Sequence, residues 1–147
     1  MIKPIQLSLL VCAACLPSLA SHCHAADINT GLWAITMETR TAAAPGFQPA
    51  PVTVNQCFTA ADARDPSKVL GGLSNPGASD CKYTERNYSG NSFRFAMQCG
   101  GGFALQTRGE VTFTDQSMNG AITAKGNVGG TQTEFQNKIS AKRVGNC

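Results

Sequence analysis

The sequence predicts an all-β domain with one short helix, folded as an antiparallel meander that forms a strongly curled sheet or half-barrel. Three observations support this fold class. Apolar and polar residues alternate along several segments, turn residues separate most of these segments, and an even number of cysteines beyond the N-terminal leader predicts two disulfides.

Residues 1–26 have the layout of a secretory signal peptide. Lys3 is the only charged residue in this segment, an apolar run follows it, and small residues precede a cleavage point at Ala25 or Ala26. The apolar run is too short to span a bilayer, and no later segment is long and apolar enough to do so. We therefore expect an exported, periplasmic protein without a transmembrane segment, consisting of a single β-rich domain over residues 27–147.

Six segments alternate between apolar and polar residues with the period of a β-strand. They are residues 33–39, 81–88, 92–99, 103–113, 118–125 and 132–142. Ser89-Gly90-Asn91 predicts a tight hairpin between the second and third segments. Only one stretch has helix signals, because Asp65-Pro66 is typical of a helix start and Gly71-Gly72 of its end. Residues 41–51 are rich in Pro and Ala and predict a loop.

Four of the seven cysteines remain once the leader is removed, and we expect them to form two disulfides. The favoured pairs are Cys57–Cys81, which would close a loop around the helix, and Cys99–Cys147, which would hold the C-terminus on a central strand. The rival pair is Cys81–Cys99, because these residues flank the predicted hairpin. A zinc site is disfavoured, since none of the four forms a C-x-x-C pair with another.

Composition excludes several functional classes. The net charge of +3 is too small to indicate nucleic-acid binding. Both histidines, His22 and His24, lie in the predicted leader, so a mature chain cut at Ala25 would lack Ser-His or Cys-His catalysis. The nine acidic residues are scattered, and none forms a spacing that requires acid–base chemistry. We therefore expect no enzyme activity, no metal and no cofactor.

The order of several motifs resembles a known family. "GLWAITMET" follows the leader; then come "VNQCFT", "DCKYTERNYSGNSFRFAMQC", a strand with Gly-Glu-Val-Thr-Phe, and a final "GNC". This arrangement resembles a family of small exported bacterial proteins described as domain of unknown function 3617, over essentially the whole mature chain. The resemblance implies a location in a Gram-negative envelope and an antiparallel β fold. It implies no activity.

Two candidate binding surfaces follow from the predicted strands. A curled sheet can hold a small apolar or lipid-like ligand between its faces, but we favour the simpler interpretation that the same residues form an ordinary core. The candidate lining residues are Trp33, Ile35, Phe93, Phe95, Phe103, Leu105 and Phe113. On the opposite face, basic residues that lie across the hairpin from one another would suit an anionic partner, or would simply be solvated. These residues are Lys82, Arg86, Arg94 and Arg108.

The hypothesis that needs the fewest special sequence features is a non-enzymatic binding or structural protein of the envelope. Exposed sheet edges pair with other chains, and we expect the strand that begins at Gly31 to be such an edge. The expected partner is another envelope protein. An apolar small molecule carried in the curled sheet is the alternative.

Overall fold

The structure, a computed structural model, describes residues 28–46, 48–74, 79–101 and 104–147, so the predicted signal peptide lies outside the described residues. The described part contains seven strands and two helices. In chain order they are β1 (Gly31–Thr41), β2 (Val52–Phe58), α1 (Ala60–Arg64), α2 (Ser67–Ser74), β3 (Ser79–Ser89), β4 (Ser92–Gly100), β5 (Leu105–Phe113), β6 (Ser117–Val128) and β7 (Thr131–Gly145).

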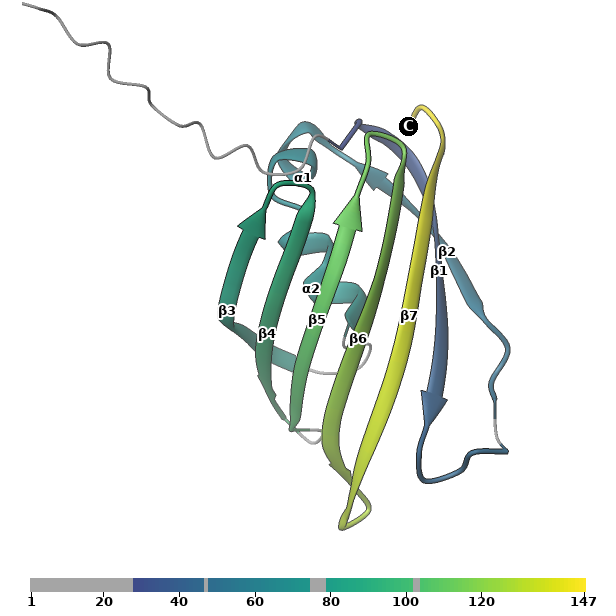
Figure 1. Cartoon of the computed structure of the whole chain (residues 1–147), viewed down its shortest axis with the longest axis vertical. Helices are drawn as coiled ribbons and strands as arrows, with labels where there is room; N and C mark the ends of the chain where they lie inside the picture. The colour runs from purple at the N-terminus through teal and green to yellow at the C-terminus, as the bar shows by residue number, and fades with distance from the viewer. Residues whose placement is uncertain (1–27, 47, 75–78, 102–103) are drawn as a thin grey trace, which may run out of the picture.

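All the strands belong to one antiparallel sheet with the order β2-β1-β7-β6-β5-β4-β3 (Figure 1). Strands β3 to β7 form a meander in which each strand pairs with the next. β1 then pairs with β7 from the opposite end of the chain, and β2 is added outside β1. The prediction of an antiparallel all-β fold is confirmed. The sheet is open, with β2 and β3 as its two edges, and the predicted half-barrel is not confirmed.

The prediction that the strand beginning at Gly31 forms an edge is wrong. β1 lies inside the sheet, because residues 52–58 form a further strand that covers its outer side. β1 and β7 also approach closely where they meet. Gly31 has φ +134°, and a Cβ at this position would lie 2.4 Å from the carbonyl oxygen of Gly145. Glycine is therefore required at the start of β1.

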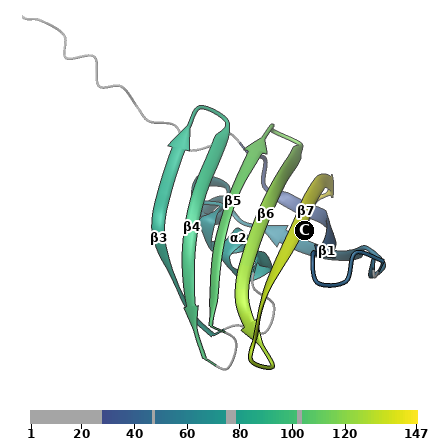
Figure 2. The ribbon, with the colours of Figure 1, turned by 60° about the horizontal axis from the view of Figure 1, so that its bottom comes forward.

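Both helices lie on one face of the sheet: α2 lies behind β4 to β6 in Figures 1 and 2, and α1 lies near the upper ends of β3 and β4 in Figure 1. They belong to the segment that leads from the β2 edge to the β3 edge. Two helices form where one was predicted. Thr59 and Asp62 make a reciprocal capping box that starts α1, and α2 follows Asp65-Pro66 but continues through the two glycines to Ser74. Leu70 is fully buried, and its packing stabilises a helix that its sequence alone favours weakly.

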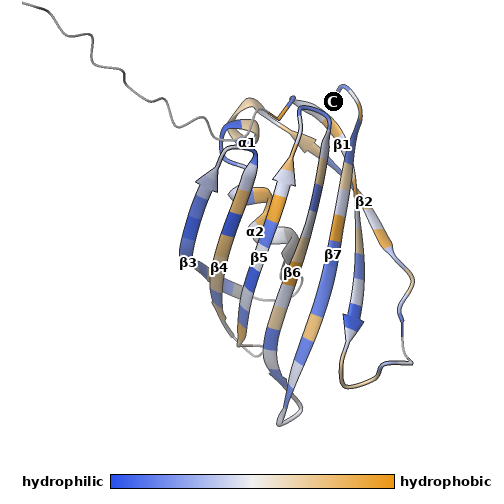
Figure 3. Ribbon diagram, viewed as in Figure 1, coloured by the Kyte–Doolittle hydropathy of each residue, from blue (hydrophilic) through white to orange (hydrophobic). Residues whose placement is uncertain are grey.

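The face covered by the helices, here called the inner face, carries the core. One cluster of buried apolar side chains from the sheet and α2 fills the space between them. It comprises Ile28, Trp33, Ile35, Phe58, Leu70, Phe93, Phe95, Met97, Val111, Phe113, Met118, Ile122, Ile139 and Ala141. The opposite, outer face is polar, and the strands alternate in hydropathy along their length (Figure 3).

Two disulfides are present, as predicted, but the favoured pairs are wrong. Cys57 is bonded to Cys147, and Cys81 to Cys99. The second pair is the rival prediction and follows from the β3–β4 hairpin, which places the two residues at the same end of adjacent strands. The first follows from the strand order, since Leu32 of β1 is opposite both Cys57 and Gly145 and so brings β2 and the C-terminus together.

Candidate functional site

The candidate site is the free side of β2. Residues 52 to 58 pair with β1 in an uninterrupted register, from Met37 opposite Val52 to Gly31 opposite Phe58. On its other side, β2 is paired with no strand of the described part of the chain. A strand in this position presents alternating N–H and C=O groups to an incoming chain. The geometry is therefore suited to the addition of an extended segment.

Two exposed valines accompany this free backbone. Val52 is 58% exposed and Val54 is 42% exposed. Val54 is opposite Ile35 in the register, and Val52 lies two residues before it, so both valines are on the inner face. In the described residues, the remaining exposed large apolar side chain is Val144, at the end of β7. Two of the three exposed large apolar side chains of the described residues thus lie on the free edge.

The other edge of the sheet is different. β3 contains Asp80, Lys82, Glu85 and Arg86, and its register with β4 shifts twice. Charged side chains and bulges are devices that prevent an edge from pairing with another chain. β2 has neither a charge nor a register shift. Figure 3 shows the contrast, because β3 is drawn mainly in hydrophilic colours whereas β2 carries hydrophobic bands.

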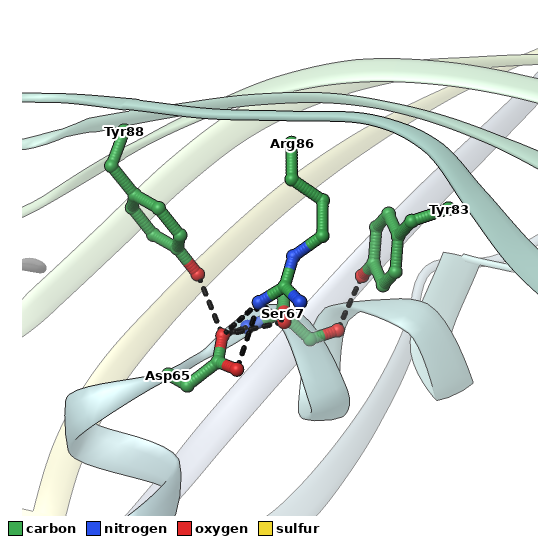
Figure 4. Close-up of polar contacts among 5 residues, drawn as sticks. All are labelled: Asp65, Ser67, Tyr83, Arg86 and Tyr88. Atoms are coloured by element: carbon green, nitrogen blue, oxygen red, sulfur yellow. Dashed lines mark hydrogen bonds and ion pairs between the residues drawn. The ribbon is translucent and has the colours of Figure 1, made fainter.

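A polar cluster further secures the β3 edge (Figure 4). The Arg86 guanidinium donates to both carboxylate oxygens of Asp65, at 2.8 Å each. Tyr88 donates to the same carboxylate at 2.8 Å, and Ser67 also donates to it. The Tyr83 hydroxyl donates to the Ser67 carbonyl oxygen. The cluster therefore ties the connection between α1 and α2 to three side chains of β3.

The electrostatics of this cluster favour the ionised carboxylate. Partial burial would raise the pKa of Asp65, but the hydrogen bonds from Ser67, Tyr88 and Arg86 outweigh it and lower the pKa to about 2. Burial raises the pKa of Tyr83 to about 12, and burial together with the Asp65 carboxylate raises the pKa of Tyr88. Both tyrosines thus remain protonated donors at neutral pH, and the cluster is a structural tie rather than an acid–base pair.

The four basic residues predicted to face an anion are not brought together. Arg86 lies on the inner face, opposite Phe95, because the register shift between Tyr83 and Glu85 reverses the alternation of β3. Lys82, Arg94 and Arg108 remain on the outer face.

Arg94 forms an ion pair with Glu110 at 3.1 Å. A shallow hollow on the outer face is lined by Glu85, Arg94, Phe95, Arg108, Gly109 and Glu110. This hollow holds as many carboxylates as guanidinium groups, so it has no net charge that would select an anion.

The predicted ligand-lining residues form the core. Trp33, Ile35, Phe93, Phe95 and Phe113 are at most 2% exposed and belong to the single buried cluster. Trp33 stacks on Phe58 with ring centroids 5.2 Å apart, and Phe93 stacks on Phe95 at 5.3 Å. Leu105 is half-buried on the inner face. Phe103 lies outside the described residues.

The described residues contain no group of three His, Cys, Asp or Glu side chains arranged to hold a metal. Their helices include none with the length and hydropathy needed to cross a bilayer. The acidic side chains that have resolved interactions serve as a helix cap at Asp62, a tie at Asp65 and ion pairs at Glu110 and Glu134.

Sequence reasoning missed β2 as a site, although one signal for it was present. No charged residue occurs between Arg40 and Asp62, and within this stretch Val52 and Val54 alternate with polar residues.

Neither the curated proteins nor the solved structures gave a significant match. The family described as "Protein of unknown function (DUF3617)" matches residues 28–147, which is the family that the motifs resemble, and the chain belongs to it.

Proposed function

We propose that this chain is an exported, non-enzymatic interaction protein of the bacterial envelope, which binds an extended segment of another polypeptide along β2. The periplasmic location is supported by the leader pattern of residues 1–26 and by the two disulfides, which persist in oxidising compartments.

The observation that carries the proposal is the difference between the two edges of the sheet. β3 has the charges, register shifts and side-chain ties that keep an edge from pairing. β2 has a regular register, free backbone groups and two exposed valines. Main-chain hydrogen bonds would provide affinity for an added strand, and Val52 and Val54 would contact alternate side chains of that strand.

The alternative, a carrier of an apolar or lipid-like ligand, has weaker support. Its lining would come from residues that are packed against one another and against the helices. Opening a ligand space there would separate stacked aromatic rings such as Trp33 and Phe58.

Site-specific photo-cross-linking in cells of the native host tests the proposal. A photoreactive amino acid replaces Val54 in one variant and Val144 in the other, since both residues are exposed valines and only Val54 lies on the free edge. We expect a discrete cross-linked protein product from position 54 and none from position 144. Equal products from the two positions, or none from position 54, would contradict binding at β2.

A further inference from the structure

We propose that the segment added to β2 is β2 of a second copy of this chain, so that two copies pair antiparallel about a two-fold axis. This inference rests on the proposed function, because it names the partner of the same edge. A two-fold axis makes an antiparallel pair of identical strands, which is the arrangement that already relates every neighbouring pair in the sheet. The product is one continuous sheet that runs through both copies.

The charge pattern fits self-pairing. Across a two-fold axis, residues close to the axis meet their own copies, so any charged residue there would face a like charge at a cost in stability. The chain has no charged residue from position 41 to position 61, which includes the whole of β2 and the loop before it. β3 would not meet this condition, because Lys82, Glu85 and Arg86 occur along it.

The ends of β2 define where the axis can lie. Pro51 precedes the strand and has no N–H to donate, and α1 begins just after it, behind the Thr59 cap. The pairing register that uses the full strand, residues 52 to 58, therefore places the axis at Asn55. In this register Val54 of each copy is directly opposite Gln56 of the other copy. The Val54 residues of the two copies are diagonal neighbours, close enough for an apolar contact.

The inner faces of the two copies become continuous at this junction. Val54 is opposite the core residue Ile35 and Val52 is opposite Met37, and the added strand would cover part of the exposed surface of both valines. A single pair of short strands buries less area than a stable, standard-sized interface. We therefore expect a reversible dimer whose population rises with protein concentration, rather than a permanent one.

Sedimentation equilibrium of the purified mature protein, with both disulfides formed, tests this inference. Val54→Lys places two ammonium groups near each other across the axis, and we expect it to weaken dimerisation about tenfold or more. Val144→Lys is the matched control, since it introduces the same side chain at an exposed valine that lies on β7, with β1 between it and β2, and it should leave dimerisation unchanged. Both variants should unfold at the wild-type urea concentration, because both sites are exposed.

Cross-linking locates the axis independently. Asn55→Cys should form a disulfide-linked dimer under mild oxidation, whereas Thr112→Cys, which is exposed on the outer face of β5, should not. A wild-type protein that stays monomeric at its highest soluble concentration would overturn self-pairing. If the wild type is monomeric but position 54 cross-links to a different protein in cells, the proposed binding of another polypeptide at β2 is retained and only self-pairing is rejected. A dimer that both lysine variants weaken equally, or that neither weakens, would also overturn self-pairing.

Discussion

Replacing Asp65 with Asn should destabilise the domain in a pH-dependent way, because this carboxylate ties the helical segment to β3. The change keeps the size of the side chain and removes its charge. Asp65 accepts hydrogen bonds from Arg86, Tyr88 and Ser67, and these lower its pKa from 3.8 to about 2. An Asn at this position cannot form the ion pair with Arg86.

The pKa difference gives the size of the effect. At 1.36 kcal/mol for each pH unit, a pKa lowered from 3.8 to about 2 corresponds to roughly 2.4 kcal/mol of folding stability. The Asp65 side chain is 35% exposed, so solvent screening reduces this figure. We expect Asp65→Asn to lower the free energy of unfolding at neutral pH by about 1 kcal/mol.

The direction of the pH dependence follows from the lowered pKa. Above about pH 4 the carboxylate is ionised in both folded and unfolded chains, and its full contribution is present. As the pH falls from about 4 to about 2, the unfolded chain takes up the proton first, and the contribution is lost. The difference between the wild type and the variant should therefore be largest at pH 7 and close to zero near pH 2.

Urea unfolding at pH 7, 4, 3 and 2, with the disulfides intact, measures this difference. Glu110→Gln is the matched control, because it removes the charge from an ion pair between two more exposed side chains on the outer face. It should have a smaller effect than Asp65→Asn at pH 7. An Asp65→Asn effect that is the same at pH 7 and pH 2 would refute the role assigned to the ionised carboxylate.

The packing and the disulfides allow further predictions. Gly109→Ala should lower the free energy of unfolding by about 1–3 kcal/mol, measured by thermal or urea unfolding, because the added Cβ would lie 2.8 Å from the Phe95 ring. Gly72→Ala is the control, since Gly72 lies in a helix with open space around it, and this change should be neutral or stabilising. Equal effects of the two substitutions would show that the inner face is not tightly packed. Removing the Cys57–Cys147 disulfide by a double Ser substitution should cost up to roughly 4–5 kcal/mol in the chain-entropy model, since it closes a 90-residue separation. Unchanged urea unfolding of the double variant would show that this cross-link does not stabilise the fold.

Sequence patterns predicted the meander well where one face of a strand is buried. The predicted segments 92–99, 118–125 and 132–142 lie inside β4, β6 and β7, and the alternation identifies their inner residues. The helices cover this face, so each strand must place its apolar side chains there. In these strands the alternation of apolar and polar residues therefore follows directly from the burial of one face.

The prediction failed where the backbone departs from regular pairing. In β3, the register shift between Tyr83 and Glu85 sends Arg86 to the inner face, where it meets Asp65. A bulge shifts the phase of the alternation, but after Glu85 only Tyr88 follows the new phase in β3, and a single residue does not establish a pattern. The Asp65 cluster was missed for this reason.

The pairing of the cysteines depends on contacts between distant parts of the chain. Cys57 meets Cys147 because β1 lies between β2 and β7, and this strand order is not encoded in any local motif. β2 itself was overlooked because it has few apolar residues, follows a Pro-rich loop and lacks a large buried side chain before Phe58. A free edge strand buries little, so its sequence carries a weak signal.

Residue-resolved amide hydrogen exchange of β2 tests the central claim most directly, since strand addition protects backbone N–H groups. In dilute protein, the amides of residues 52 to 58 that point away from β1 should exchange quickly, while those bonded to β1 are protected. At high concentration, pairing of two copies along β2 should protect the outward-pointing amides, and the amides of β3 should not change. Protection that develops along β3 or elsewhere, with β2 unchanged, would contradict the assignment of β2 as the binding edge.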